Sequence, residues 1–419
     1  MRTPRGCRTG CLTSLLAGVV AIVLAVRWWT APVNIPRPQR PPEPMDNPYD
    51  VYRSLAAYTA QVFRTDFALT YAERELFPSR REIRLDRPGL ARYLLRQMQP
   101  VRLEYRRHLH KPCVVIMEYM PGWQFPELAE FRRWANIEAL DMAMAAQEGD
   151  YSRAVENYRT VLLLSEQIRT QGSLMHYYTS SSMQAAVHRR MSELLGSLPA
   201  EQCQQLTQAI REWEKKRVPL AQIVRVERDF ILTLLHDLYA GQYDAWRMLS
   251  DSRLLRWNPR WLNLRRAARE VHTYLRRVEG ETSKPVNLWQ HVEEPHHPVT
   301  KILLPPLEPL KRTSGHTTCR IRLLGCAAAV RAYRLRHGSY PAMLEDAGVS
   351  DLDRDPFTGG RFVYKPSERG FLLYSVGEDG VDDGGKRVAE QMSGRGDVTL
   401  VPFYGRRTDT EQGEPVWFR

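Results

Sequence analysis

The segment FLLYSVGEDGVDDGG, residues 371–385, carries a dense group of carboxylates after a run that alternates like a β-strand. Glu378, Asp379, Asp382 and Asp383 lie among four glycines. Calcium binds about six to eight oxygens, which carboxylates, loop carbonyls and water can supply together. Asp-Gly and Gly-Gly pairs are equally what a tight turn requires. The residues therefore predict either a calcium loop, with Asp379, Asp382 and Asp383 as ligands and calcium as the only cofactor, or a solvated turn.

Two other clusters contain residue types that bind metals or act in catalysis. HVEEPHH, residues 291–297, offers histidines and glutamates, but its spacing matches no standard zinc pattern and Pro295 interrupts a helix. RRHLHKPC places His108 and His110 beside Cys113, which suits either an enzyme site or an exposed basic turn. The sequence contains no phosphate loop, GxGxxG, HExxH, CxxC or GxSxG motif, which weakens the enzyme hypothesis.

The elements around the acidic segment predict a small α+β unit. Residues 316–348 begin with a long amphipathic helix, which Gly338 is placed to end. DPFTGGRFVYKPSERGFLLYSV then predicts two short strands, about 361–365 and 371–376, joined by a five-residue turn. One helix packed on a small antiparallel sheet is the simplest arrangement of these pieces.

Three motifs in this unit carry a resemblance. AVRAYRLRHGSYPAML, DPFTGGRFVY and YSVGEDGVDDGG, in this order, resemble the C-terminal globular part of the major pseudopilin of bacterial type II secretion, over about residues 316–385. The resemblance implies a long helix on a small sheet, followed by a calcium-binding loop. It matches Asp379 to the acidic residue of the family's Ala-Asp-Gly loop, with Asp382 and Asp383 as the nearest counterparts of the later acidic pair.

The N-terminus departs from that family. Prepilins are cut before an apolar helix and carry a glutamate at the fifth mature position, whereas here Gly10 precedes Cys11 and the fifth position is Leu15. The apolar run near the N-terminus also lies about 300 residues before the pseudopilin-like part. We therefore expect that this chain does not polymerise into a pilus-like fibre.

The central part of the chain has the apolar periodicity of helices. Residues 130–168 predict two helices joined at Gly149 and Asp150, because Gly ends helices and Asp caps them. Further helices are expected over about 173–196, 200–215 and 218–240.

One hairpin in this region, near residues 137–166, resembles a tetratricopeptide repeat. Glu138 and Asp141 stand where its first helix should carry bulky residues, and no second copy follows at a period of about 34 residues. We therefore expect a helical bundle with one repeat-like hairpin rather than a repeat array.

The first thirty residues predict a membrane anchor. Arg2, Arg5 and Arg8 precede the uncharged run LTSLLAGVVAIVLAV, residues 12–26, and Trp28 follows it, as at a membrane interface. A cleaved signal peptide shares these regions, but no well-placed cleavage site follows the run. We expect an uncleaved anchor with a cytoplasmic N-terminus, followed by a stiff proline-rich spacer.

Charge and cysteine content narrow the classes of function. The net charge is +12 and the pI is about 9.5, but the arginines are spread among acidic residues on helix-like segments, so we expect no nucleic acid partner. Six cysteines in a chain of 419 residues do not form a disulfide framework. Cys319 and Cys326 lie seven residues apart on the predicted helix, too far for a disulfide within it, and are expected to be buried.

The sequence thus predicts an α+β, predominantly α protein: a transmembrane anchor (1–30), a proline-rich spacer (31–48), a helical domain (49–280), a proline-rich connection (281–311) and a pseudopilin-like module (312–419). This organisation favours a bacterial, single-pass inner-membrane protein whose extracytoplasmic part binds a protein partner, in association with type II secretion machinery. The alternative is a membrane-anchored enzyme, with its site in the helical domain or at the junction with the C-terminal module.

Overall fold

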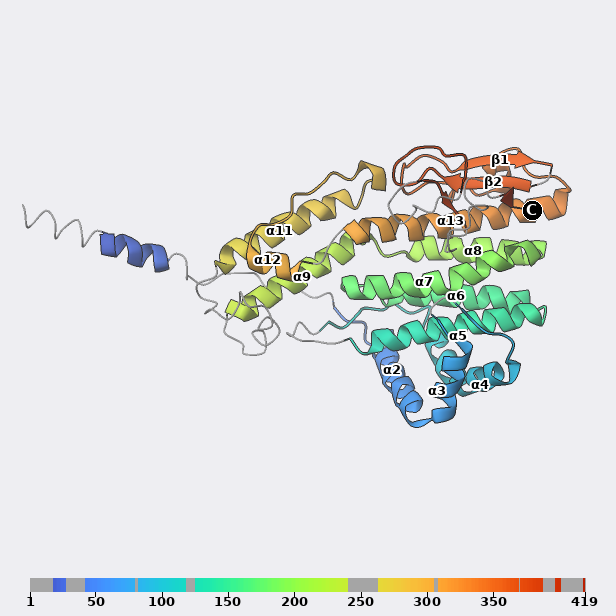
Figure 1. Ribbon diagram of the computed structural model, residues 1–419, viewed down its shortest axis with the longest axis horizontal. Helices are drawn as coiled ribbons and strands as arrows, with labels where there is room; N and C mark the ends of the chain where they lie inside the picture. Colours follow the sequence, from blue (N-terminus) through green and yellow to red (C-terminus); the bar gives the residue numbers. More distant parts are fainter. Residues whose placement is uncertain are drawn as a thin grey trace, which may run out of the picture.

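The computed structural model describes residues 18–27, 42–79, 82–117, 125–239, 263–304, 308–368, 370–386, 396–400 and 417–418. Helices dominate these residues, and their strands form one small antiparallel sheet (Figure 1). The expected α+β, predominantly helical fold is confirmed. Most of the predicted proline-rich spacer lies outside the described residues.

The predicted membrane anchor is described only in part. Residues 18–27 are helical, and large apolar side chains on this segment, among them Val19, Ile22 and Leu24, are more than half exposed. The remainder of the apolar run, and Trp28, lie outside the described residues. Among the residues that are described, no helix is both long enough and apolar enough to cross a membrane.

The first two thirds of the chain form helices close to the expected positions. Asn47 and Asp150 accept hydrogen bonds from backbone N–H groups of the helices they cap, and Gly149 has the positive φ that favours glycine. The helices are α2 (Pro48–Thr65), α3 (Phe67–Leu76), α4 (Pro88–Arg107), α5 (Glu127–Gln147), α6 (Tyr151–Gln167), α7 (Leu174–Leu194), α8 (Ala200–Lys216) and α9 (Leu220–Tyr239). The expected helix pair around Gly149 and the three helices after it are confirmed.

The helices are stacked in layers that follow the chain (Figure 1). Helices α2, α3 and α4 pack together, and α2 and α4 cover α5. Helix α5 then packs on α6 and α7, and α6 packs on α8. Helices that follow one another in the chain, such as α5 and α6, are therefore in contact, and so are pairs separated by one helix, α5 with α7 and α6 with α8.

The C-terminal part adds one long helix to this stack. Helix α13 (Glu308–His337) packs along α8 and also touches α7. It begins eight residues earlier than expected from the sequence and ends, as expected, before Gly338, which has a positive φ. Cys319 and Cys326 on α13 are free and fully buried, as predicted.

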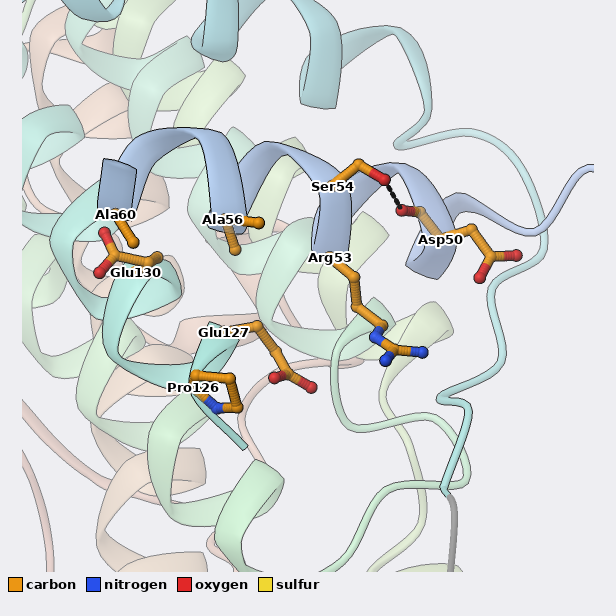
Figure 2. A pocket seen from close by; sticks show the side chains of 9 residues that line it. Asp50, Arg53, Ser54, Ala56, Ala60, Pro126, Glu127 and Glu130 are labelled. Atoms are coloured by element: carbon orange, nitrogen blue, oxygen red, sulfur yellow. Dashed lines mark hydrogen bonds between the residues drawn. The ribbon is translucent and has the colours of Figure 1, made fainter. Parts of the chain in front are cut away.

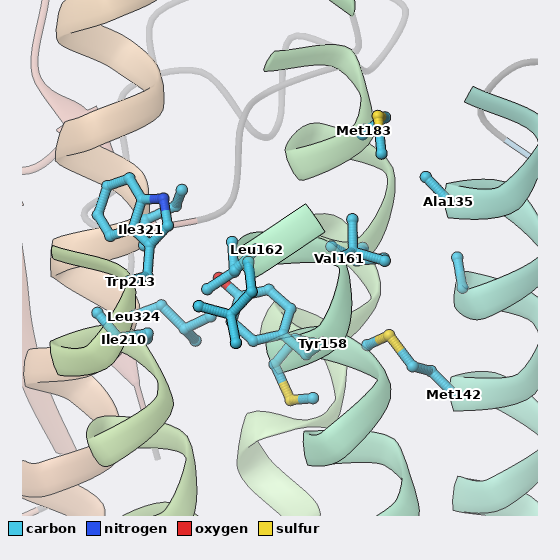
Figure 3. Packing of buried hydrophobic residues seen from close by; sticks show 14 of the residues in the cluster. Ala135, Met142, Tyr158, Val161, Leu162, Met183, Ile210, Trp213, Ile321 and Leu324 are labelled. Carbon is cyan, nitrogen blue, oxygen red and sulfur yellow. The ribbon is translucent and has the colours of Figure 1, made fainter. Parts of the chain in front are cut away.

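A single apolar core runs through these layers. Figure 3 shows Met142 of α5, Tyr158 of α6, Met183 of α7, Ile210 of α8 and Leu324 of α13 within one cluster. The same cluster includes sheet residues such as Phe371 and Leu373. The C-terminal unit therefore shares its core with the helical region.

The remaining helices form a second core. Helices α9, α11 (Leu264–Glu281) and α12 (Pro298–Leu303) pack with the first turns of α7 and α13 around an apolar cluster that includes Ile223, Leu235 and Val271. In Figure 1 this group extends from one end of the stack. The segment expected to be a proline-rich connection thus contains α12 and the start of α13.

The sheet lies against α13. Strand β2 (Gly370–Ser375) pairs antiparallel with β1 (Val363–Ser367), β3 (Val398–Thr399) and β4 (Trp417–Phe418). The predicted strand positions are shifted: β1 begins two residues later than expected, and two residues rather than five join it to β2. The shift arises because pairing continues through Pro366 and Ser367, whose partners are Phe371 and Gly370.

Candidate functional site

The acidic segment after β2 is a folded turn. Asp379 accepts hydrogen bonds from the N–H groups of Val381, at 3.2 Å, and Gly396, at 3.0 Å. Glu378 faces α13 instead, with Oε1 3.7 Å from Lys311 Nζ and Oε2 3.4 Å from Arg312 Nε. These contacts join the turn to the chain before β3 and to the first turns of α13.

The second half of this turn is joined to β2 and β3. Asp382 accepts hydrogen bonds from the Tyr374 hydroxyl and the Gly384 N–H, both at 2.8 Å, and the tyrosine bond lowers the pKa of this carboxyl. Asp397 is fully buried and accepts the Gly385 N–H at 2.6 Å. Burial, together with the charges of Asp382 and Asp383, raises the pKa of Asp397 to about 6.

Two of the three predicted calcium ligands, Asp379 and Asp382, therefore act as acceptors for backbone N–H groups. Within the described residues, no group of three or more His, Cys, Asp or Glu side chains has a metal-binding arrangement. The charges of Asp382 and Asp383 act on Asp397, and a bound cation would reduce the repulsion among these carboxylates. Calcium binding by Asp379, Asp382 and Asp383 stays a prediction, tested below.

In the two other sequence clusters, the histidines make separate contacts or are exposed. His297 caps α12, where its Nδ1 accepts the Val299 N–H at 3.3 Å, whereas His296 is exposed and lies 3.2 Å from Glu293. In RRHLHKPC, His108 contacts Glu104 at 3.2 Å and His110 is exposed.

The second cluster also contains the thiol of Cys113, which is unreactive. Cys113 is buried, and burial raises its pKa to about 12. A thiol with a raised pKa is a poor nucleophile, because the thiolate is the reactive form. The residues near 106–113 are therefore not brought together as a reactive centre.

A cavity of about 500 Å³ lies between α2 and the first turns of α5 (Figure 2). Arg53 and Glu127 project into it from the two helices, and Asp50 and Glu130 contribute further carboxylates. Alanines of α2 and Pro126 supply its apolar walls. We call this space the α2–α5 cavity.

Glu127 is backed by a buried chain of hydrogen bonds. The Tyr49 hydroxyl donates to Glu127 Oε1 at 3.0 Å and lies 3.0 Å from His176 Nε2. On the other side of the ring, His176 Nδ1 lies 3.3 Å from the Ser173 N–H and 3.0 Å from the Ser173 hydroxyl. Tyr49 and His176 have no exposed surface, and burial lowers the pKa of His176 to about 3.

A basic groove of about 430 Å³ crosses α5 and α7. Small side chains and arginines line it, together with Glu73 and Glu82; we call it the arginine groove. The small residues include Ala129, Ser182, Ala185 and Ala186, and the arginines are Arg132, Arg133, Arg189 and Arg190.

Four arginines and two glutamates line the groove, so the charge of its lining is net positive. Arg133 binds Glu73 at 2.6 Å, and Arg190 binds Glu193 at 2.8 Å, whereas Arg132 is exposed and has no ion pair among the described residues. A smaller hollow beside it shares Ala185 and Arg189 and adds Arg320 of α13. The basic surface therefore continues from α5 across α7 to α13.

No sequence motif predicts the α2–α5 cavity or the arginine groove. Tyr49, Glu127 and His176 come from α2, α5 and α7, and no short motif joins them. In the arginine groove, adjacent arginines on two helices resemble the basic residues found throughout the chain. Only the packing of α5 on α7 brings them to one surface.

Comparison with known proteins found no matching family model, curated protein or solved structure.

Proposed function

We propose that this chain is a bacterial membrane-anchored, extracytoplasmic interaction protein, and that the arginine groove binds an acidic segment of a partner protein. The pseudopilin-like C-terminal unit suggests association with type II secretion machinery. The observation that carries the proposal is the groove itself, which four arginines and several small side chains line.

The shape and charge of the groove favour a protein segment as the ligand. Exposed Ala129, Ser182 and Ala185 leave room for another backbone to approach the helices closely. Arginine forms bidentate hydrogen bonds with carboxylates and is enriched in protein interfaces. Charge complementarity therefore points to aspartate and glutamate side chains on the partner.

The membrane anchor rests on the N-terminal composition and on the described helical residues 18–27. Val19, Ile22 and Leu24 expose apolar surface that a bilayer would cover. The arginines before the run favour a cytoplasmic N-terminus. The proline-rich residues after it would hold the bundle away from the membrane.

Orientation can be tested with reporter enzymes fused after Arg419 of the full-length chain. Alkaline phosphatase is active only outside the cytoplasm, so we expect an active phosphatase fusion and an inactive β-galactosidase fusion. An inactive phosphatase together with an active β-galactosidase would contradict the extracytoplasmic assignment.

Groove binding can be measured on the full-length chain in detergent, with a fluorescent peptide of alternating glutamate and alanine. We expect saturable binding that weakens with added salt and is reduced by Arg132→Gln and by Arg189→Gln. Arg96→Gln is the matched control, because Arg96 is an exposed arginine of α4 outside the groove. Equal losses in all three variants would mean that net charge alone attracts the peptide, and the groove assignment would fail.

A further inference from the structure

We propose that the α2–α5 cavity is a binding site for an organic ammonium ion carried on an alkyl chain, such as a diamine or a lysine side chain, with Glu127 as its counter-ion. The cavity and the arginine groove are lined by different residues, although Glu130 of the cavity is ion-paired with Arg133 of the groove. It is carried by the burial of Glu127, by the hydrogen-bond chain behind that residue and by the composition of the cavity walls.

Glu127 is a buried carboxylate at the start of α5. The side chain lines the cavity, and the residue is only 6% exposed. Among the described residues it accepts one hydrogen bond, from Tyr49 to Oε1, and forms no ion pair. A buried carboxylate without a cation is costly, because burial removes most of its hydration. A cation in the cavity would offset that cost.

The residues behind Glu127 supply no positive charge. Since the Ser173 N–H can only donate, His176 Nδ1 accepts, and the His176 proton lies on Nε2 and points to Tyr49. The Tyr49 hydroxyl in turn donates to Glu127. Because burial lowers the pKa of His176 to about 3, the imidazole is neutral at physiological pH. The chain of hydrogen bonds therefore orients the carboxylate and adds no positive charge of its own.

The composition of the walls indicates what kind of cation fits. Ala56, Ala57 and Ala60 line the cavity along α2 and suit the methylene groups of an alkyl chain. Asp50 and Glu130 add negative charge, although Glu130 is ion-paired with Arg133. A volume of about 500 Å³ is within the range of small-molecule sites.

Arg53 sets a limit on where the cation can lie. It is half-buried and projects from α2 into the same space as Glu127 in Figure 2, but the two residues form no ion pair. Its positive charge would repel an ammonium group placed near it and so favours a position beside Glu127. Removing this charge should therefore tighten binding.

The test uses cadaverine as the probe and calorimetric titration of the full-length protein in detergent. We expect cadaverine to bind and the uncharged diol of the same chain length not to bind. Glu127→Gln, which keeps an acceptor for Tyr49, should weaken cadaverine binding by at least about tenfold. Arg53→Gln should strengthen it.

The thermal stability of Glu127→Gln separates a binding role from a structural role. If the charge of Glu127 is reserved for a ligand, its removal should raise the melting temperature of the unliganded protein. A fall in melting temperature, with cadaverine binding unchanged, would overturn the proposal. So would a failure of cadaverine to bind the unmodified protein.

A second pair of variants tests the cavity without changing its charge. Ala57→Leu places a larger side chain at an exposed wall position and should block cadaverine. Ala68→Leu makes the same change at an exposed position of α3, outside the cavity, and should leave binding unchanged. Equal affinities for both variants would contradict the assignment of the site.

Discussion

Arg322 of α13 and Glu214 of α8 form a bidentate ion pair, in which Nε lies 3.1 Å from Oε2 and Nη2 lies 2.6 Å from Oε1. A third bond, from Arg322 Nη1 to the Arg354 carbonyl at 2.8 Å, extends the contact towards the sheet. The C-terminal helix is thus fixed to the helical stack by polar contacts as well as by the shared core.

Loss of this ion pair should destabilise the whole bundle. Arg322→Gln removes the charge-assisted bonds from a largely buried site, so we expect the free energy of unfolding to fall by about 2 kcal/mol. Urea denaturation measures the effect, and Arg336→Gln, at an exposed position of the same helix, is the control. If the stack and the C-terminal unit unfold in separate transitions, and Arg322→Gln changes only one of them, the two parts are less coupled than the shared core indicates.

A buried ionic network joins α4, α5 and α6. Glu138 accepts hydrogen bonds from Arg102, Arg106 and Tyr105, and Asp141 binds Arg102 and Asn157. Burial alone would raise the pKa of Glu138, but the guanidinium groups outweigh it and lower that pKa. Two arginines of α4 thus pair with Glu138 and Asp141 inside the bundle.

Glu138→Gln should lower the free energy of unfolding by about 3 kcal/mol, since it leaves buried guanidinium groups without their anion. Glu148→Gln, near the exposed end of the same helix, should cost less than about 1 kcal/mol. Because the folded-state pKa of Glu138 is lowered, its contribution is present above its ordinary value of 4.5 and is lost as the pH falls below it. Similar effects of the two substitutions would show that the network is not stabilising.

Two glycines of the acidic turn differ in the space around them. Gly377 and Gly384 both have positive φ, of 72° and 77°. A Cβ on Gly377 would lie 2.4 Å from the Gly396 carbonyl oxygen, whereas a Cβ on Gly384 would meet no atom within 4 Å.

Gly384→Ala should therefore cost only the strain of a positive φ, about 1 kcal/mol. Gly377→Ala must also displace the backbone that leads into β3, so we expect a loss of at least about 3 kcal/mol. Thermal unfolding of the two variants compares them directly. Equal stabilities would show that the approach of the Gly377 and Gly396 backbones is not required.

Asp397 should make stability depend on pH. Its pKa is raised from 3.8 to about 6, so between these values the folded state holds a proton that the unfolded chain has released. The free energy of unfolding should therefore fall as the pH rises through this window and then level off. We expect Asp397→Asn to lose this part of the pH dependence, measured as the difference between the two proteins in urea. A constant difference across the window would refute the burial of this carboxyl.

Calcium binding has a direct test in the full-length protein. A ligand that binds only the folded state adds about 2.7 kcal/mol at a hundred times its dissociation constant. If the acidic turn binds calcium, the melting temperature should rise with calcium and the rise should vanish in the Asp379→Asn, Asp382→Asn double variant. An unchanged melting temperature in a folded protein would leave the segment as a turn held by its hydrogen bonds.

Local signals determined much of the fold. Helical periodicity, the Gly149-Asp150 junction and the Gly338 stop identified α5 to α9 and the end of α13, because caps and apolar spacing act within a few residues. The alternating strands after residue 360 predicted a hairpin, but not its register. Register depends on which residues pair across the strands, and that is decided by the two-residue turn and by packing on α13.

The sequence by itself therefore determined the central helices α5 to α9, the end of α13, the β1–β2 hairpin and the candidate acidic turn. Only the tertiary structure decided that α13 shares the core of the stack, that Glu138 and Asp141 are neutralised by α4, and that Glu127 faces a cavity. These relationships join residues far apart in the chain, so no local spacing records them. Their physical basis is the burial of charge and apolar surface, which exists only once the helices have packed.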